Sequence, residues 1–348
     1  EVDAACGPDT EAARAASRVW GVTAEGNFEG SGATVLSVMA SPAGEAETAA
    51  LERARKAMFA VREARPKPFR DEKLLASWNG LMIGALAEAG AALDPSLVRM
   101  AVAAMEYVDR VLVEHDANGN ARVKRLAKDG VAKGHGFLDD LAYLADAAID
   151  LYEATGDPRW VTLARALARS IVAHHLDPSD GGFFFVPDDG ETILVRAKDP
   201  YDHAVPSGAS VACRALSRLG TLVDPRLGEI ATRAIETLGP AAERNPAGMS
   251  NSVLLADRVV RGSTDVVLVG PRSAEGTRAL AGAVFRANIR YRVLAWADPA
   301  DPASIEACSV LAEGKLGHPG PLAYVCQGRT CSLPIRDPGE LARALASG

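Results

Sequence analysis

The chain has 348 residues, of which 48% are hydrophobic and 24% charged, and its formal net charge is −7. This is the composition of a globular protein long enough for one large domain or two medium ones. It contains no basic stripe with interleaved aromatic residues, so we expect no nucleic-acid partner. No apolar run of about 18 residues predicts a membrane span, and the first residues do not form an apolar signal segment. Five cysteines, an odd and scattered number, fit a reducing compartment, so we expect a cytoplasmic protein.

In chain order, the first predicted elements are a loop leading to a short strand over 26–39 and an amphipathic helix over 44–63. Three helix pairs follow, over 74–90 with 95–115, 137–155 with 160–175, and 206–222 with 225–243. In the second pair, Gly156 ends the first helix, Asp157 caps the next, and Pro158 lies in its first turn. Residues 177–196 predict a turn followed by a β-hairpin.

The two helices of the second pair differ in amphipathicity. Apolar residues occupy nearly every face of 138–155, whereas Trp160, Leu163, Leu167 and Ile171 form a single stripe on 160–175. A helix that is apolar all round is buried, and one with a single stripe covers it. Alternating inner and outer helices predict a partial α/α toroid, and a generic layered helical bundle remains the alternative.

The C-terminal region changes character. Its β-branched runs "STDVVLVG", "YRVLAWAD" and "LAYVCQG", with a helix around 277–286, predict a small α/β appendage. The fold class is therefore mainly α, with helical hairpins and this appendage. We expect an N-terminal loop, strand and helix over 1–70, the hairpin toroid portion over 71–261, and the α/β region over 262–348.

Several stretches together resemble a known family: "WGVTAEGNFEG", "RPKPFRDEKLLASWNGLMIGALA", "GFLDDLAYLADAAIDLYEATGDPRW", "GGFFF", "RAKDPYDHAVPSGAS" and "AYVCQGRTCSLPIRDP". In this order they are similar to the C-terminal part of the thioredoxin-domain-containing family related to spermatogenesis-associated protein 20, which includes the YyaL-type bacterial proteins and was formerly a domain of unknown function. The resemblance implies a thioredoxin-like domain followed by a toroid similar to N-acylglucosamine 2-epimerases and six-hairpin glycosidases. It also implies that this domain, a partner in the full-length protein, and the first toroid hairpins precede the part of the family that this chain matches.

The resemblance places candidate site residues in the loops that lead into the inner helices, because toroids commonly form their pocket there. Equivalent loops of neighbouring hairpins converge in a ring, so residues far apart in sequence can share one site. It implies neither a cofactor nor a metal, and a sugar-like small molecule as the ligand. The candidates in the three loops are Trp78, Asn79, His135, Asp139, Asp140, Arg196, Lys198, Asp202, His203 and Ser207.

Two adjacent carboxylates, Asp139 and Asp140, open the apolar helix 138–155. Carboxylates in a first helical turn interact favourably with the helix dipole, so a structural role at the helix end is one reading. In the other reading they are catalytic, and Asp139 is the better candidate. At 100° per residue it shares an arc with Tyr143, Asp146 and Asp150. A polar stripe on an apolar helix should face a wet cavity or be hydrogen-bonded inside.

The remaining candidates also have two readings. His135 and His203 could transfer protons, as histidines do in epimerases of the similar fold, or lie in surface loops. Trp78 and Asn79 could stack on and hydrogen-bond a sugar ring, or be a core residue and a helix cap. For the other candidates, the roles are Asp202 as a catalytic acid, Tyr143 and Ser207 as substrate contacts, and Arg196 and Lys198 as holders of an anionic group or as solvated charges.

Three functions follow as hypotheses. The first is a carbohydrate-related enzyme, epimerase- or glycosidase-like, with an acidic and aromatic cavity. The second is a ligand- or client-binding module that assists a thioredoxin-like redox domain. The third is an inactive fragment with an apolar surface exposed on its first helix pair. Cys326 and Cys331 are five apart and predict either a strand–turn disulfide or two free thiols.

Overall fold

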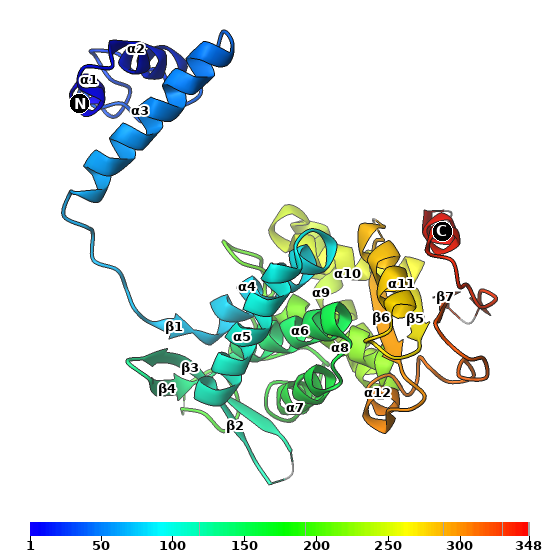
Figure 1. Cartoon of the computed structure of the whole chain (residues 1–348). Helices are drawn as coiled ribbons and strands as arrows, with labels where there is room; N and C mark the ends of the chain where they lie inside the picture. The colour runs from blue at the N-terminus through cyan, green and yellow to red at the C-terminus, as the bar shows by residue number, and fades with distance from the viewer. Residues whose placement is uncertain (118, 192, 288, 329, 347–348) are drawn as a thin grey trace. The chain divides into compact units, whose positions relative to one another are not determined.

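The computed structural model describes residues 1–117, 119–191, 193–287, 289–328 and 330–346 (Figure 1). Its internal contacts divide the chain into two compact units, one covering Glu1–Asp71 and the other beginning at Glu72. No helix among the described residues is both long and apolar enough to cross a membrane.

The first unit is a small helical cluster. It contains α1 (Val2–Cys6), α2 (Thr10–Val19) and α3 (Glu45–Glu63). Alanines on α2 and α3, including Ala16 and Ala54, are fully buried between the helices, and the Asp9 side chain caps α2 by accepting from the Ala12 amide at 3.0 Å. The predicted helix over 44–63 is confirmed. The short strand predicted within 26–39 is wrong, because the described residues there form only an isolated bridge between Phe28 and Ala33.

Three helical hairpins build most of the second unit. They are α4 (Ala76–Ala92) with α5 (Pro95–Leu112), α6 (Leu138–Thr155) with α7 (Arg159–His174), and α8 (Gly208–Leu222) with α9 (Pro225–Arg244). Helix α6 packs between α4 and α8 (Figure 1), and α5, α7 and α9 each pack on the outside of their own partner. This is the inner-and-outer arrangement of a partial α/α toroid, and it confirms the predicted fold class.

The burial of α6 explains why it is the central inner helix. Fourteen of its side chains are buried, whereas α5 and α9 bury only one stripe each. Gly156 ends α6 in a left-handed conformation with φ 68°, which suits glycine because it lacks a Cβ. The short linkers that follow each inner helix then reverse the chain into the outer helix.

Two glycines on α4 bring it close to α6. A Cβ on Gly80 would lie 2.7 Å from the Tyr143 carbonyl carbon, and a Cβ on Gly84 would lie 2.7 Å from Oδ2 of Asp150. At Gly80 the contact is with backbone, so a larger residue there would force the helices apart, whereas at Gly84 the Asp150 side chain would have to move. Glycine at position 80 therefore sets how closely the helices approach.

Two sheets complete the second unit. Strand β3 (Ala121–Lys128) pairs antiparallel with β1 (Leu74–Leu75), β2 (Val113–His115) and β4 (Val131–His135). The C-terminal sheet has the order β6-β5-β7-β8, with β5 (Thr264–Val269) parallel to β6 (Arg292–Ala297) and antiparallel to β7 (Leu322–Gln327). Strand β8 (Thr330–Cys331) pairs with β7, and a disulfide joins Cys326 to Cys331 across this pair. The disulfide is one of the two predicted alternatives.

Helices flank the C-terminal sheet and connect it to the hairpins. They are the 3-10 turn η1 (Ala247–Met249), α10 (Ser250–Arg261), α11 (Glu275–Arg286), α12 (Pro302–Glu306) and α13 (Pro338–Ala346). Strand β6 is joined to the end of α6, since Trp296 donates its indole N–H to the Glu153 carbonyl at 2.9 Å and its amide to the Tyr152 hydroxyl at 3.0 Å. The predicted strands and the helix of the C-terminal α/β region are confirmed.

The β-hairpin predicted over 177–196 is wrong. The described residues of this segment form an irregular loop with a single bridge between Leu176 and Phe183. Side chains replace the ladder: Arg196 donates from Nη2 to the carbonyls of His174 and Val186, at 2.6 and 2.8 Å. Lys198 binds Asp177 and Asp180 at 2.7 and 2.6 Å. Backbone carbonyls bonded by side chains have less need of a partner strand.

Candidate functional site

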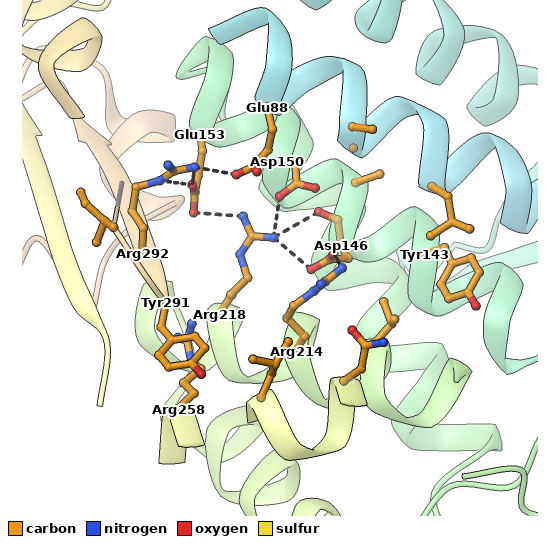
Figure 2. A pocket seen from close by; sticks show the side chains of 18 of the residues that line it. Glu88, Tyr143, Asp146, Asp150, Glu153, Arg214, Arg218, Arg258, Tyr291 and Arg292 are labelled. Atoms are coloured by element: carbon orange, nitrogen blue, oxygen red, sulfur yellow. Dashed lines mark hydrogen bonds and ion pairs between the residues drawn. The ribbon is translucent and has the colours of Figure 1, made fainter. Parts of the chain in front are cut away.

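A pocket of about 680 Å³ lies along the flanks of the inner helices (Figure 2). Its walls come from α4, α6, α8 and α10, and from the segment joining the end of α11 to the start of β6. The volume falls in the range usual for small-molecule sites, about 300–1,000 Å³. All of these elements belong to the second unit.

Carboxylates from α6 form one wall of the pocket. Asp146, Asp150 and Glu153 follow each other at helical spacing and share one face. Arg218 of α8 reaches all three: its Nη1 lies 2.9 Å from Asp146 Oδ1 and 2.7 Å from Asp150 Oδ1, and its Nη2 lies 3.0 Å from Glu153 Oε1. Figure 2 shows this guanidinium at the centre of the network. One arginine therefore links α8 to about two turns of α6.

Other residues extend the network in both directions. Arg214, one turn before Arg218, pairs with Oδ2 of Asp146. At the other end, Arg292 of β6 lies 3.0 Å from Glu153 Oε2 and 2.8 Å from Glu88 Oε1 on α4. The ion pairs thus tie α4, α6, α8 and the C-terminal sheet together around the pocket.

The three carboxylates of α6 have different acidities. Burial alone would raise the pKa of Asp146, but Arg214 and Arg218 outweigh it and hold that pKa below the usual range. Burial raises the pKa of Asp150 to about 7, an effect that Arg218 opposes and that the charges of Asp146 and Glu88 strengthen. The network therefore places an ionised carboxylate one turn from a carboxyl group that changes protonation near neutrality.

The predicted acid Asp140 lies outside this pocket and is fully buried. Its Oδ2 accepts from the Phe137 amide at 2.9 Å, and its Oδ1 accepts from the Ser77 amide at 3.0 Å. It therefore caps its own helix and also the start of α4. Arg125 pairs with it at 2.8 Å. These contacts are those of the structural reading of the helix end.

Asp139 lies beside this cap. Its carboxylate is 3.1 Å from Nη1 of Arg125, and its side chain is 15% exposed. Gly208 at the start of α8 packs against its backbone, since a Cβ there would lie 3.0 Å from the Asp139 amide nitrogen. The starts of α4, α6 and α8 thus lie next to one another, although none of the candidate residues in the three loops lines the pocket. Asp139 is the more accessible of the two carboxylates.

Asp202 and Ser207 are also engaged at helix starts. Asp202 accepts from the Ser207 amide at 2.8 Å and from the Asn251 amide at 2.9 Å, so it connects α8 to α10. Ser207 caps α8 by accepting from the Ser210 amide at 3.1 Å.

Tyr143 donates its hydroxyl to the Pro206 carbonyl. Burial, followed by the charges of Asp139 and Asp202, raises the pKa of this phenol, and of the predicted residues only Tyr143 lines the pocket.

The other candidates lie at the surface or hold loops. Trp78 is 64% exposed on α4, and Asn79 donates to the Leu75 carbonyl at 2.8 Å. His135 is exposed at the end of β4, and His203 is exposed, with its ring 3.7 Å from Asp199. Arg196 and Lys198 hold the 177–200 loop through their bonds to its carbonyls and carboxylates. On the first helix pair and its linker, the apolar side chains of Trp78, Met82, Leu93 and Met100 are exposed.

Only some of the residues that line the pocket could be predicted from the sequence. The polar stripe on α6 is visible in the sequence, and its members Tyr143, Asp146 and Asp150 do face a cavity. The acids at i, i+4 and i+7 of α6, matched by arginines at i and i+4 of α8, are a signal that could have identified the pocket. The contributions of Glu88, Arg258 and Arg292 depend on tertiary packing and had no local signal.

One group could hold a cation elsewhere. His174, Asp188 and Asp189 offer ligand atoms within 4.8 Å of one another near the protein surface. His174 already pairs with Asp188 at 2.7 Å, and Arg122 pairs with Asp189. Because Arg122 pairs with Asp189 and His174 pairs with Asp188, both carboxylates are already engaged. The group is therefore an ion-pair cluster near the surface.

Comparison with known proteins supports the predicted resemblance. The chain is 30% identical to human spermatogenesis-associated protein 20 over 298 residues, which is 83% of this chain and 38% of that protein. It is 28% identical to the uncharacterized protein B0495.5 of Caenorhabditis elegans over 304 residues, or 84% of this chain and 40% of that protein. The chain is a homologue of spermatogenesis-associated protein 20. It spans about two fifths of the length of these relatives, and no family model matches it.

Solved structures similar to this homologue include epimerases and glycoside hydrolases. Cellobiose 2-epimerase from Spirochaeta thermophila aligns with a TM-score of 0.39 and 18% identity, covering 49% of this chain and 44% of that one. The GH76A α-1,6-mannanase from Salegentibacter aligns with a TM-score of 0.38 and 12% identity, covering 68% of this chain and 70% of that one. Because the identities and TM-scores of these alignments are low, the function must be argued from the residues of the pocket.

Proposed function

We propose that the pocket is the active site of a carbohydrate-related enzyme of the sugar isomerase and epimerase class, in which Asp150 transfers the proton. One observation carries this proposal: Asp146 and Asp150 stand one turn apart on the pocket wall, and their pKa values are shifted in opposite directions. Two carboxyl groups whose environments separate their pKa values are the usual pattern of acid/base sites. A pKa near 7 is the best value for a group that must both accept and return a proton at neutral pH.

The chemistry of the pocket favours a ligand rich in hydroxyl groups. Carboxylates, guanidinium groups and the Asn251 side chain line it, and each offers several hydrogen bonds in a fixed plane. The aromatic rings of Tyr143, Phe285 and Tyr291 add the apolar surface that a sugar ring can cover. A cavity that combines charged groups with apolar surface in this way suits a monosaccharide better than a lipid.

In the proposed reaction, ionised Asp150 takes a proton from the carbon next to the carbonyl of an open-chain sugar. The electron pair of that C–H bond moves into the carbonyl and forms an enediolate, which the arginines beside the pocket stabilise. The protonated Asp150 then returns this proton to the former carbonyl carbon, while the hydroxyl proton of the neighbouring carbon passes to the former carbonyl oxygen. The product is the isomeric ketose or aldose, and no oxidant, reductant or other co-reactant is consumed.

Glycoside hydrolysis is less well supported by the same residues. It requires two carboxyl groups that are both free to act on the sugar, one as acid and one as base or nucleophile. Both oxygens of Asp146 are held by arginines, Oδ1 by Arg218 and Oδ2 by Arg214. Asp146 is therefore better suited to tuning the acidity of Asp150 than to attacking a sugar carbon.

The proposal can be tested without knowing the product. The chain is incubated in D₂O with a panel of aldoses, ketoses, hexuronates and sugar phosphates, and deuterium entry beside the carbonyl is followed by NMR. We expect exchange with at least one class, at a rate that increases through about pH 7 as Asp150 ionises. Asp150→Asn should lower the rate at least about 100-fold.

Asp129→Asn is the matched control, because Asp129 is an exposed carboxylate in the turn between β3 and β4 with a positive φ that asparagine tolerates. It should leave the exchange rate unchanged. Absence of exchange with every class, or undiminished exchange in folded Asp150→Asn, would contradict the proposal. Binding of a sugar without exchange would instead support the ligand-binding module, the alternative that assists a thioredoxin-like domain.

A further inference from the structure

Arg258 differs from the other buried arginines around the pocket. It comes from α10, lines the pocket and is only 7% exposed. Arg214, Arg218 and Arg292 all pair with carboxylates. Among the described residues, the Arg258 side chain forms no hydrogen bond or ion pair, and its nitrogens are not among the fully buried atoms that lack a partner, so they remain accessible from the pocket. Figure 2 shows it rising beside Tyr291, apart from the network of dashed contacts.

A guanidinium that is largely withdrawn from water and has no partner in the protein is poorly stabilised. Burial, and then the positive charge of Arg218, lowers the pKa of Arg258, but an arginine does not lose its proton in a protein. The cost of removing a charge from water is offset only by a close counter-ion with good geometry. A ligand that brings an anionic group to Arg258 would supply this counter-ion.

The nearby Asp265 does not fill this role. It stands at the start of β5, and although its charge favours the protonated state of Arg258, the two residues form no ion pair. Its Oδ1 is buried and has no hydrogen-bond partner within the described residues. Burial raises the pKa of Asp265. Arg258 is therefore left to the pocket.

The charge of the whole pocket points in the same direction. Five arginines and four carboxylates line it, so one positive charge is in excess when all are ionised. The carboxylates are Glu88, Asp146, Asp150 and Glu153, and the uncompensated arginines are Arg258 and the exposed Arg286 at the end of α11. Because Arg286 is exposed to solvent, Arg258 is the largely buried arginine of the lining that an anionic group on the ligand could pair with.

We propose that the pocket takes an anionic sugar, whose carboxylate or phosphate group pairs with Arg258. The inference rests on the proposed function for the sugar part of the ligand. The planar fork of a guanidinium matches both anions with two parallel hydrogen bonds, so the shared chemistry is an oxyanion on a sugar. Arg258 then fixes one end of the ligand, while Asp150 faces the pocket from the opposite wall, on α6.

Calorimetric titration of the full chain with glucuronate, glucose 6-phosphate and glucose tests this inference. We expect at least one anionic sugar to bind about tenfold or more tighter than glucose. Whether glucuronate or glucose 6-phosphate binds tighter distinguishes a carboxylate from a phosphate ligand. Equal affinity for glucose and both anionic sugars would overturn the inference.

Three variants assign the effect to Arg258. Arg258→Gln should lower the affinity for the anionic sugar about tenfold or more, and Arg258→Lys should recover part of it because the charge remains. Arg261→Gln is the matched control, since Arg261 lies on the same helix but is exposed and pairs with Asp257. It should stay within about twofold. An unchanged affinity in Arg258→Gln would contradict the role of this residue.

The outcomes separate this inference from the proposed function. If Asp150→Asn binds anionic sugars with the arginine dependence and lacks deuterium exchange, both stand. If the wild-type chain binds anionic sugars through Arg258 but exchanges no deuterium, the anion site stands and the proton-transfer function fails. If exchange occurs only with neutral sugars, the anion site fails and the proton-transfer function stands.

Discussion

Two groups of carboxylates on the same helix, α6, have opposite surroundings. Asp140, in the first turn, gives its oxygens to the amides of Phe137 and Ser77 and to Arg125. Asp150, about three turns later, meets Arg218 and the open side of Gly84, and its side chain stays 14% exposed on the pocket. The first turn of a helix has free N–H groups that need acceptors, and the helix interior has none. Asp140 at the helix start can therefore cap backbone N–H groups, whereas Asp150 in the interior finds no free N–H on its own helix and meets a cation and the pocket.

The largest expected effect concerns the architectural member of this comparison. Asp140→Ala leaves the amides of Phe137 and Ser77 without an acceptor and removes a carboxylate from Arg125. We expect a loss of about 3–5 kcal/mol in the free energy of unfolding, measured by urea denaturation. Asp139→Ala, which removes a partly exposed partner of the same arginine, should cost about 1 kcal/mol. Similar losses of stability in Asp140→Ala and Asp139→Ala would contradict the assignment of Asp140 as the helix cap.

The next effect tests the close approach of α4 and α6. Gly84→Ala places a methyl group 2.7 Å from Oδ2 of Asp150, and we expect it to cost about 1–3 kcal/mol in stability. Gly239→Ala is the matched control, because Gly239 lies on exposed α9 with nothing within 4 Å of its Cβ position. The gain in helix propensity is there opposed by the ring of Pro240, which disfavours a β-carbon on the preceding helical residue, so the change should stay within about 1 kcal/mol. If Gly84→Ala were as stable as the control, the Asp150 side chain could move away from the new methyl group at little cost.

A third prediction uses the acidity of Asp150. Burial raises its folded-state pKa to about 7, from 3.8. A raised carboxyl pKa contributes stability that is complete below the unfolded value and is lost as the pH rises through 7. Relative to Asp150→Asn, the wild-type chain should therefore lose at least about 1.4 kcal/mol between pH 4 and pH 8, the equivalent of one pKa unit. Parallel curves of unfolding free energy against pH would contradict this acidity.

The fold was largely predictable and the pocket only partly, for a physical reason. Apolar periodicity and turn residues such as Gly156 are local, so the helix pairs and the inner helix 138–155 could be predicted from the sequence. The 177–200 loop could not, because Arg196 and Lys198 satisfy its polar groups from outside the expected ladder. At the site, the stripe through Asp146 and Asp150 was visible. The partners that set its chemistry lie on α4, α8 and β6, and only packing brings them there.

The smallest effect concerns the two predicted histidines. His135 and His203 lie shortly before inner helices, where the resemblance to toroid proteins placed candidate site residues. Both are exposed, and neither lines the pocket. We expect His135→Ala and His203→Ala each to change the free energy of unfolding by no more than about 0.5 kcal/mol. The deuterium exchange rate should also be unchanged. A large loss of deuterium exchange in either variant would indicate that the active site lies at the helix starts and not in the pocket.

The most direct test of the comparison measures Asp139→Asn and Asp150→Asn side by side in the deuterium exchange assay. Both changes replace a carboxylate of α6 by an amide of the same shape, one at the helix start and one on the pocket wall. We predict that exchange falls at least about 100-fold in Asp150→Asn and less than about tenfold in Asp139→Asn, with both chains folded. The reverse pattern would contradict the assignment of the pocket wall as the catalytic region.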